Sequence, residues 1–271
     1  VILRVMGLGA QMTLWPDELV EALVGEGFRV IRYDNRDIGL SQKIEGARAP
    51  SLPMQVLRKK IGFPARVPYT LADMARDGIG VLDALEIGAA HVVGASMGGM
   101  IAQLMAVHHP DRLLSLTSVM STTGNPKLPP AEKNAMNALI APLKGMDEET
   151  LVEHGLNIAR NIGSPGFPFD PEQQRAKVLR NVRRSVYPAG PPRQLAAIID
   201  DGDRRARLAK VRVPTLVLHG EDDPLIKLPA AEDTARAIPG ARLVTIPGWG
   251  HDIPIPLVPR VASEIVSLAR G

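Results

Sequence analysis

Ser96 stands within Gly94-Ala95-Ser96-Met97-Gly98, directly after an apolar run and directly before a run with helical character. This G-x-S-x-G pattern is typical of a nucleophile elbow, a tight strand-to-helix turn in which glycines let the backbone pass close by. The turn exposes the serine hydroxyl at the carboxyl end of the strand. Because serine alone is a weak nucleophile, it needs a base and an acid that orients the base. Ser96 is therefore the candidate nucleophile, provided that the chain supplies both groups.

Two later loops carry groups of the required kinds, and each loop follows a predicted strand. A carboxylate cluster at 221–223 comes after the apolar run 213–219, and His251 comes after the run 241–246. Ligands of parallel sheets bind at the carboxyl ends of the strands. We therefore expect both loops to lie at the same sheet edge as Ser96.

His251 is the candidate general base because it lies in a late, glycine-rich loop that follows a predicted strand. It would first accept a proton from the serine and later donate that proton to the leaving group. The other five histidines have structural interpretations, in a strand, at a helix end or in the middle segment: His91, His108, His109, His154 and His219.

Apolar runs alternate with runs of helical periodicity along most of the chain. Strands are predicted near 1–6, 28–33, 90–95, 114–120, 213–219 and 241–246. Helices are predicted near 16–26, 71–87, 97–109, 228–238 and 256–270, the second of them opened by a capping box at Thr70 and Asp73. This alternation predicts an α/β fold with a mostly parallel sheet and helices on both faces.

The alternation stops between about 122 and 205. Apolar residues there follow helical spacing, and breaks are expected at 163–166 and 188–192. We interpret residues 122–205 as a helical cap that is inserted after the strand at 114–120 and covers the active site. Residues 1–121 and 206–271 would then form the core. Most of the apolar side chains in the cap would pack against each other, and some would face the pocket.

Composition excludes several classes of protein. The 271 residues are 45% hydrophobic, contain no cysteine and carry a net charge of +3, so neither a disulfide framework nor a thiolate metal site is expected. No apolar run approaches the roughly 20 residues of a membrane span. Only 3% of the residues are aromatic, which argues against nucleic-acid binding. Five basic residues share one predicted helix, which we interpret as a solvated face: Arg175, Lys177, Arg180, Arg183 and Arg184.

The chain resembles the α/β-hydrolase superfamily, and within it the bacterial esterases typified by aclacinomycin methylesterase. The resemblance rests on Val5-Met6-Gly7, Trp15-Pro16-Asp17-Glu18, Val30-Ile31-Arg32-Tyr33-Asp34, Arg36-Asp37, Ser96-Met97-Gly98, Pro214-Thr215-Leu216-Val217, Asp223-Pro224 and Gly250-His251. It spans nearly the whole chain except about 125–190. The order serine, acid, histidine is also that of this superfamily. The resemblance implies the fold and the reaction type, but not the substrate, because this fold hosts many chemistries.

The resemblance also selects one acid from the carboxylate cluster. Its spacing favours Asp223, which stands just before a proline, over the neighbouring Asp222. Glu221 and Asp222 would then cap the loop or lie in solvent. The acid would hold the imidazole tautomer and stabilise the imidazolium.

An oxyanion hole requires two N–H donors aimed at the developing negative charge. The N–H of Met97, just after the nucleophile, is one candidate, and the resemblance places the other at Leu8. Met6 departs from the family's usual histidine and removes a side chain that could brace this loop. Met12 and Trp15 follow the loop, and substrate contact and core packing are equally open for both.

The sequence therefore predicts an enzyme without cofactor or metal that cleaves small or medium carboxylic esters through an acyl-enzyme. A lactonase, a C–C bond hydrolase or a cofactor-free perhydrolase would use the same three residues. A non-catalytic ligand-binding member of the fold is a further alternative. The expected partner is a small ester, and the expected state is a cytoplasmic monomer or homodimer. Because the chain starts inside an apolar run without Met, we also expect that an amino-terminal segment precedes Val1.

Overall fold

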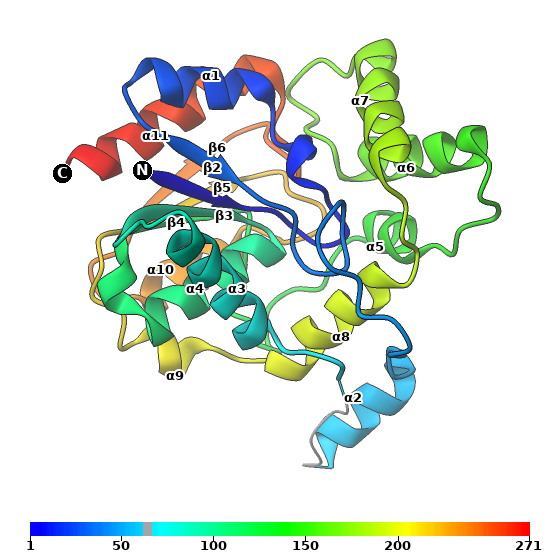
Figure 1. The fold of residues 1–271 in the computed structure, drawn as a ribbon, viewed down its shortest axis with the longest axis horizontal. Helices are drawn as coiled ribbons and strands as arrows, with labels where there is room; N and C mark the ends of the chain where they lie inside the picture. The colour runs from blue at the N-terminus through cyan, green and yellow to red at the C-terminus, as the bar shows by residue number, and fades with distance from the viewer. Residues whose placement is uncertain (62–66) are drawn as a thin grey trace.

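The computed structural model describes residues 1–61 and 67–271. Its centre is a parallel six-stranded sheet with strand order β2-β1-β3-β4-β5-β6 (Figure 1). The strands are β1 (Ile2–Val5), β2 (Val30–Arg32), β3 (Ala90–Ala95), β4 (Leu113–Val119), β5 (Thr215–Gly220) and β6 (Arg242–Ile246). The predicted parallel α/β sheet is confirmed, and each strand overlaps a predicted apolar run.

Helices cover both faces of the sheet, because alternate strand residues pack on opposite sides. Ile2 and Val93 pack in one apolar cluster with α1 (Asp17–Gly25) and α11 (Val258–Arg270). The cluster on the opposite face holds Leu3 and Val92 and is covered by α3 (Leu71–Ala84), α4 (Met97–His108) and α10 (Pro229–Ala237). The central strands β1, β3, β4 and β5 are largely buried on both faces, and such strands read as continuous apolar runs in the sequence. Short elements complete this part: η1 (Met12–Leu14), η2 (Pro110–Arg112), α9 (Arg205–Leu208) and η3 (Ile255–Leu257).

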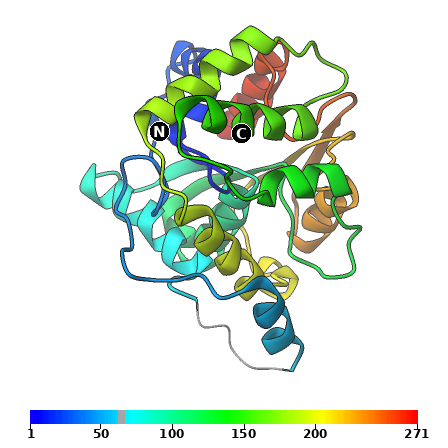
Figure 2. The ribbon, with the colours of Figure 1, turned by 90° about the vertical axis from the view of Figure 1, so that its right-hand side faces the viewer.

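Between β4 and the short helix α9 the chain forms α5 (Lys133–Ile140), α6 (Glu148–Ile162), α7 (Pro171–Arg184) and α8 (Gly190–Asp201), which we call the inserted helices. They lie on the side of the molecule toward which the strands run (Figures 1 and 2). The predicted break at 188–192 is in part the first turn of α8, because proline is well tolerated at the first positions of a helix. In α5, Met136 and Ile140 are exposed and small alanines occupy the buried positions, so these two apolar side chains do not pack the segment internally.

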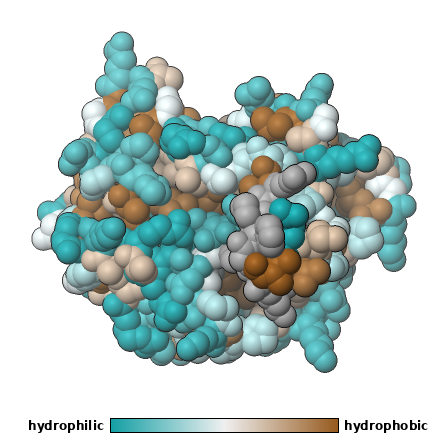
Figure 3. All heavy atoms as spheres, turned by 90° about the horizontal axis from the view of Figure 1, so that it is seen from below, coloured by the Kyte–Doolittle hydropathy of each residue, from teal (hydrophilic) through white to brown (hydrophobic). Residues whose placement is uncertain are grey.

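Helix α2 (Leu52–Lys60) has no counterpart in the sequence analysis. It lies beside α8, and its Met54 and Leu57 are exposed. Figure 3 shows the face on which α2 lies; hydrophilic residues cover most of it, with smaller apolar areas between them. The sequence signal for α2 is weak because a proline and three consecutive basic residues stand within its nine residues.

The capping box that opens α3 is confirmed. The Thr70 hydroxyl accepts a hydrogen bond from the Asp73 N–H, while the Asp73 carboxylate accepts one from the Thr70 N–H. We expect Thr70→Ala to lower the free energy of unfolding by about 1 kcal/mol, because one helical N–H loses its partner. Urea unfolding measures this change. Thr70→Ser keeps the hydroxyl and should recover most of the loss; equal losses in both variants would show that the cap contributes nothing.

Candidate active site

Ser96 occupies a strained turn between β3 and α4. Its backbone has φ 57° and ψ −120°, a left-handed conformation that costs free energy for a residue with a side chain. The flanking glycines are required by space. A Cβ at Gly94 would lie 2.1 Å from the Gly98 carbonyl oxygen, and a Cβ at Gly98 would lie 2.1 Å from the Val5 carbonyl oxygen. The predicted elbow is therefore present, with Ser96 at the amino-terminal end of α4.

The structure brings Ser96, Asp223 and His251 together at the carboxyl edge of the sheet. His251 Nε2 lies 3.0 Å from Ser96 Oγ, and His251 Nδ1 lies 2.6 Å from Asp223 Oδ2. Asp223 belongs to the β5 loop (residues 221–227), and His251 belongs to the β6 loop (residues 247–252). The two ring nitrogens thus contact the serine on one side and the carboxylate on the other, which is the arrangement needed to move a proton from the hydroxyl to the imidazole.

Asp223 is held as a buried carboxylate. Its side chain is 1% exposed, and its Oδ1 accepts hydrogen bonds of 2.8 Å from the N–H groups of Leu225 and Ile226. Burial by itself raises the pKa of Asp223, but the charge and hydrogen bond of His251 outweigh burial and hold the pKa below its ordinary value. The group therefore stays ionised at neutral pH, facing the imidazole.

The two other carboxylates of the cluster bind elsewhere. Asp222 Oδ2 accepts a 2.7 Å hydrogen bond from the N–H of Gly248, and Glu221 accepts one of 2.8 Å from the hydroxyl of Thr245. Both side chains therefore connect the β5 loop to β6 and the loop that follows it. Asp223 is the member of the cluster that contacts His251.

His219 has the packed, hydrogen-bonded environment predicted for it. It is buried, and its Nε2 lies 2.7 Å from the carbonyl oxygen of Ile226 and 3.7 Å from Asp223 Oδ2. Burial lowers the pKa of His219, although the nearby Asp223 charge opposes the effect. The side chain is therefore neutral at neutral pH, and its contact with the Ile226 carbonyl oxygen supports the β5 loop.

The loop after β1, residues 6–11, passes directly over Ser96. A Cβ at Gly7 would lie 3.2 Å from Ser96 Cβ, so the glycine allows the close approach. Leu8 follows on this β1 loop, and Met97 is the first residue of α4. A hydrogen bond of 2.8 Å from Asn35 Nδ2 to the Met6 carbonyl oxygen braces the loop. The N–H groups of Leu8 and Met97 remain the predicted oxyanion donors.

Of the two residues considered for substrate contact, Trp15 takes the core-packing alternative. It is 1% exposed and packs with Ile2 and Leu19, while the Arg4 guanidinium lies 4.2 Å from its ring centre. Met12 is partly exposed, and its N–H donates to Asp34 Oδ1 over 2.8 Å. Contact between substrate and Met12 stays a prediction.

The basic helix face is not simply solvated. Arginines of α7 form ion pairs with α6 and with the core, at 2.7 Å for Arg183–Glu148, 2.9 Å for Arg180–Asp17 and 2.7 Å for Arg184–Asp34. They thus attach α7 to its neighbours, and this role could not be seen in the sequence because each partner lies far away along the chain.

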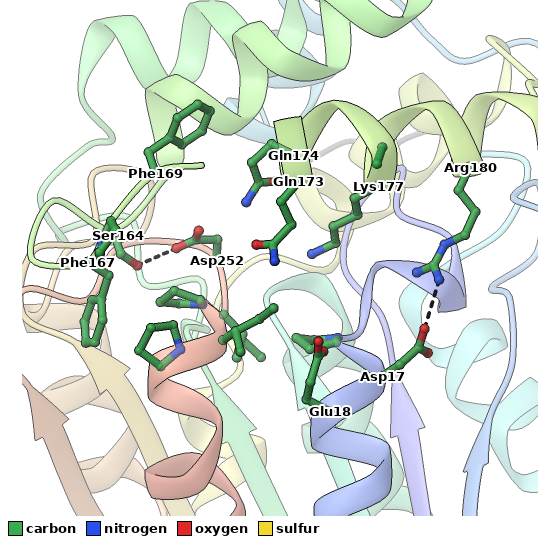
Figure 4. Close-up of a pocket in the computed structure, with 17 residues that line it drawn as sticks. Asp17, Glu18, Ser164, Phe167, Phe169, Gln173, Gln174, Lys177, Arg180 and Asp252 are labelled. Atoms are coloured by element: carbon green, nitrogen blue, oxygen red, sulfur yellow. Dashed lines mark hydrogen bonds and ion pairs between the residues drawn. The ribbon is translucent and has the colours of Figure 1, made fainter. Parts of the chain in front are cut away.

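A cavity of about 300 Å³ lies beside the β6 loop (Figure 4). Its walls come from α7, the start of α1 and residues 252–256; Lys177 and Asp252 are among the polar side chains that line it. Asp252 also accepts a hydrogen bond from the Ser164 hydroxyl (Figure 4). Neither Ser96 nor His251 lines this cavity, so it borders the loop that carries the histidine rather than the space above the serine.

Within residues 1–61 and 67–271, no group of three or more His, Cys, Asp or Glu side chains is arranged to hold a metal ion. Among the helices in that same part of the chain, none is long and apolar enough to cross a membrane.

Comparison with known proteins shows the family of the chain. A family model described as the alpha/beta hydrolase fold matches residues 1–256. The chain belongs to this family. The α/β-hydrolase is 31% identical to the rhodomycin D methylesterases DauP of Streptomyces sp. (strain C5) and DnrP of Streptomyces peucetius; each alignment covers 100% of this chain and 91% of the relative. Among solved structures, a thermophilic esterase from Thermogutta terrifontis has a TM-score of 0.72 and 27% identity, covering 99% of this chain and 89% of the esterase. The α/β-hydrolase is accordingly a carboxylic ester hydrolase.

Proposed function

We propose that this α/β-hydrolase cleaves its ester through an acyl-enzyme, with Ser96 as nucleophile, His251 as base and then acid, and Asp223 as the orienting carboxylate. The observation that carries the proposal is the pair of contacts made by one imidazole, 3.0 Å to Ser96 Oγ and 2.6 Å to Asp223 Oδ2. The strained turn that carries Ser96, at the amino-terminal end of α4, supports the same assignment.

In the proposed mechanism, Ser96 Oγ attacks the ester carbonyl carbon while its proton passes to His251 Nε2. The carbonyl oxygen becomes an oxyanion, which accepts hydrogen bonds from the N–H groups of Leu8 and Met97. The ionised Asp223 stabilises the imidazolium. His251 then gives the proton to the departing alcohol as the C–O bond breaks. A water molecule, deprotonated by His251, attacks the acyl-enzyme, and Ser96 recovers its proton as the carboxylic acid leaves.

Residues 122–205 are proposed to form a cap over this site, with 1–121 and 206–271 as the core. The position of the inserted helices supports the division, because the segment starts just after β4 and its helices contact the loops that carry the proposed catalytic groups. The N–H of Glu132 donates to the Pro224 carbonyl oxygen over 2.8 Å, and the N–H of His251 donates to the Ile162 carbonyl oxygen over 2.7 Å. A substrate above Ser96 would therefore lie between the sheet edge and these helices.

The proposed substrate is a methyl or other small-alcohol ester of an acid with an apolar body. Two observations support this class: the relatives named as methylesterases, and the apolar side chains of the inserted segment. A cofactor is not part of the proposed chemistry, because the serine, histidine and carboxylate supply the nucleophile and all proton transfers.

A panel of p-nitrophenyl esters from acetate to palmitate tests the proposal. We expect turnover that peaks at one acyl length, because an acyl group enclosed between the sheet edge and the inserted helices would be limited in size. Methyl esters of apolar acids, followed by release of methanol, then test the alcohol side. If folded protein turns over no ester in either set, the esterase assignment is wrong, and lactones or C–C substrates of the same serine become the next compounds to assay.

A further inference from the structure

Gln194 of the inserted helix α8 connects that helix to the β1 loop. Its side chain is 0% exposed, and both ends of its amide are bonded. Oε1 accepts a 2.9 Å hydrogen bond from the N–H of Gly9, and Nε2 donates over 3.0 Å to the carbonyl oxygen of Arg36. A buried amide with both ends satisfied has one orientation, so Gln194 presents a fixed acceptor to Gly9.

Gly9 immediately follows Leu8, whose N–H is one of the two proposed oxyanion donors. Gly9 has φ +67°, a left-handed conformation, and a Cβ at this position would lie 3.3 Å from Pro191 of α8. On the other side of Leu8, Gly7 packs against Ser96. The peptide planes around Leu8 are therefore fixed at two points, by contact with the nucleophile on one side and by Gln194 on the other.

The helix that supplies this hydrogen bond is itself anchored. Arg193, the neighbour of Gln194, forms a buried ion pair of 3.1 Å with Asp37, and Gln194 binds the backbone of the same segment at Arg36. Helix α8 therefore cannot move away from the core without breaking a buried ion pair and the two hydrogen bonds of the buried Gln194 amide. Such groups are costly to leave unpaired.

We infer that Gln194 is a positioning residue. Its hydrogen bond, made from the inserted helix, fixes the peptide between Leu8 and Gly9 and thereby aims the N–H of Leu8 at the oxyanion. This inference rests on the proposed function. It also means that α8 stays in place during the reaction. This helix then supports the oxyanion hole and does not act as a mobile lid. Asn35 braces the start of the β1 loop at the Met6 carbonyl oxygen, and the Gln194 amide supports the same loop three residues later, from a different part of the chain.

Gln194→Met tests the inference because methionine has a similar length but cannot accept the Gly9 hydrogen bond. We expect kcat for a p-nitrophenyl ester to fall by about 10- to 100-fold, since losing an oxyanion donor outright costs about 100- to 1,000-fold. KM should change less than about threefold, because the interaction strengthens in the transition state. Inhibition by a trifluoromethyl ketone, which forms a tetrahedral adduct with the serine, should weaken by the same factor as kcat/KM.

Gln194→Glu separates positioning from mere stability. A glutamate keeps the acceptor for Gly9, while a buried carboxylate facing the Arg36 carbonyl oxygen is the more destabilising change. We expect Gln194→Glu to unfold at a lower temperature than Gln194→Met and yet to keep the higher kcat. If kcat instead follows thermal stability across the two variants, Gln194 has only a structural role.

Gln55→Met is the matched control. Gln55 is also a buried glutamine and donates to α8, at the carbonyl oxygen of Ala196, but it does not bind the β1 loop. Its kcat should stay within about twofold of wild type. If Gln194→Glu does not fold, comparing kcat and KM of Gln194→Met with those of Gln55→Met still tests the inference.

Ser96→Ala in the same assay keeps the two proposals distinguishable. Full activity in Ser96→Ala overturns the proposed function. An inactive Ser96→Ala beside a fully active Gln194→Met overturns only the inference.

Discussion

Replacing Ser96 with alanine should abolish ester hydrolysis, with a loss in kcat of about a million-fold. Alanine leaves no atom to attack the carbonyl, while the elbow, the histidine and the carboxylate remain. Initial rates on the best p-nitrophenyl ester of the panel, with folding checked by circular dichroism, measure the effect. Alanine should not destabilise the turn, because it has the same Cβ as serine and so meets the same backbone strain at the positive φ of position 96.

Ser115 provides a matched control for this experiment. It is a buried serine on β4 whose hydroxyl lies 2.9 Å from a ring nitrogen of His91, so it forms a serine–histidine pair outside the site. Ser115→Ala should keep kcat within about threefold of wild type. A serine-directed fluorophosphonate should label wild type and Ser115→Ala but not Ser96→Ala. Comparable activity in Ser96→Ala and wild type would remove Ser96 from the mechanism.

The residues that meet at the candidate site were predictable because each follows a strong local signal. Ser96 lies in a glycine turn between two regular elements, and His251 lies in a glycine-rich loop after a buried strand. The parallel sheet then places the carboxyl ends of these strands at one edge, so their loops meet without further information. The choice of Asp223 over Asp222 as the acid rested only on the resemblance to the family. Two adjacent carboxylates show no local difference in the sequence that tells which one turns inward.

The supports of the site were not predictable, because they depend on long-range pairs with no local pattern. Gln194 and Gly9 are 185 positions apart, and Ser164 and Asp252 are 88 apart. A glutamine in a helix is usually a solvated side chain, and only the folded chain shows that this one is buried. The same reasoning applies to the arginines of α7, which look like a solvated face in the sequence and form ion pairs in the structure.

Together these contacts give the inserted segment a role in assembling the site. It binds each of the three loops that carry proposed catalytic groups: the β1 loop through Gln194, the β5 loop through Glu132 and the β6 loop through Ile162. The Ser164 hydroxyl adds a second connection to the β6 loop, because it accepts a 2.9 Å hydrogen bond from the N–H of Gly250. Deleting the segment should therefore remove the geometry of the site as well as any cover over it.

The sharpest test of the acid is the pair Asp223→Asn and Asp222→Asn, because the two residues are neighbours with the same chemistry. Asp223→Asn should lower kcat by about 10,000-fold, since an amide can present an N–H to His251 Nδ1 and favour the wrong tautomer for accepting the serine proton. In Asp222→Asn the amide oxygen can still accept the N–H of Gly248, so kcat should stay within about fivefold of wild type. Steady-state kinetics at neutral pH, where the lowered pKa keeps Asp223 ionised in the wild type, compare the variants directly. Equal losses at both positions would mean that the carboxylates only hold the loop together, whereas the expected difference assigns the orienting charge to Asp223.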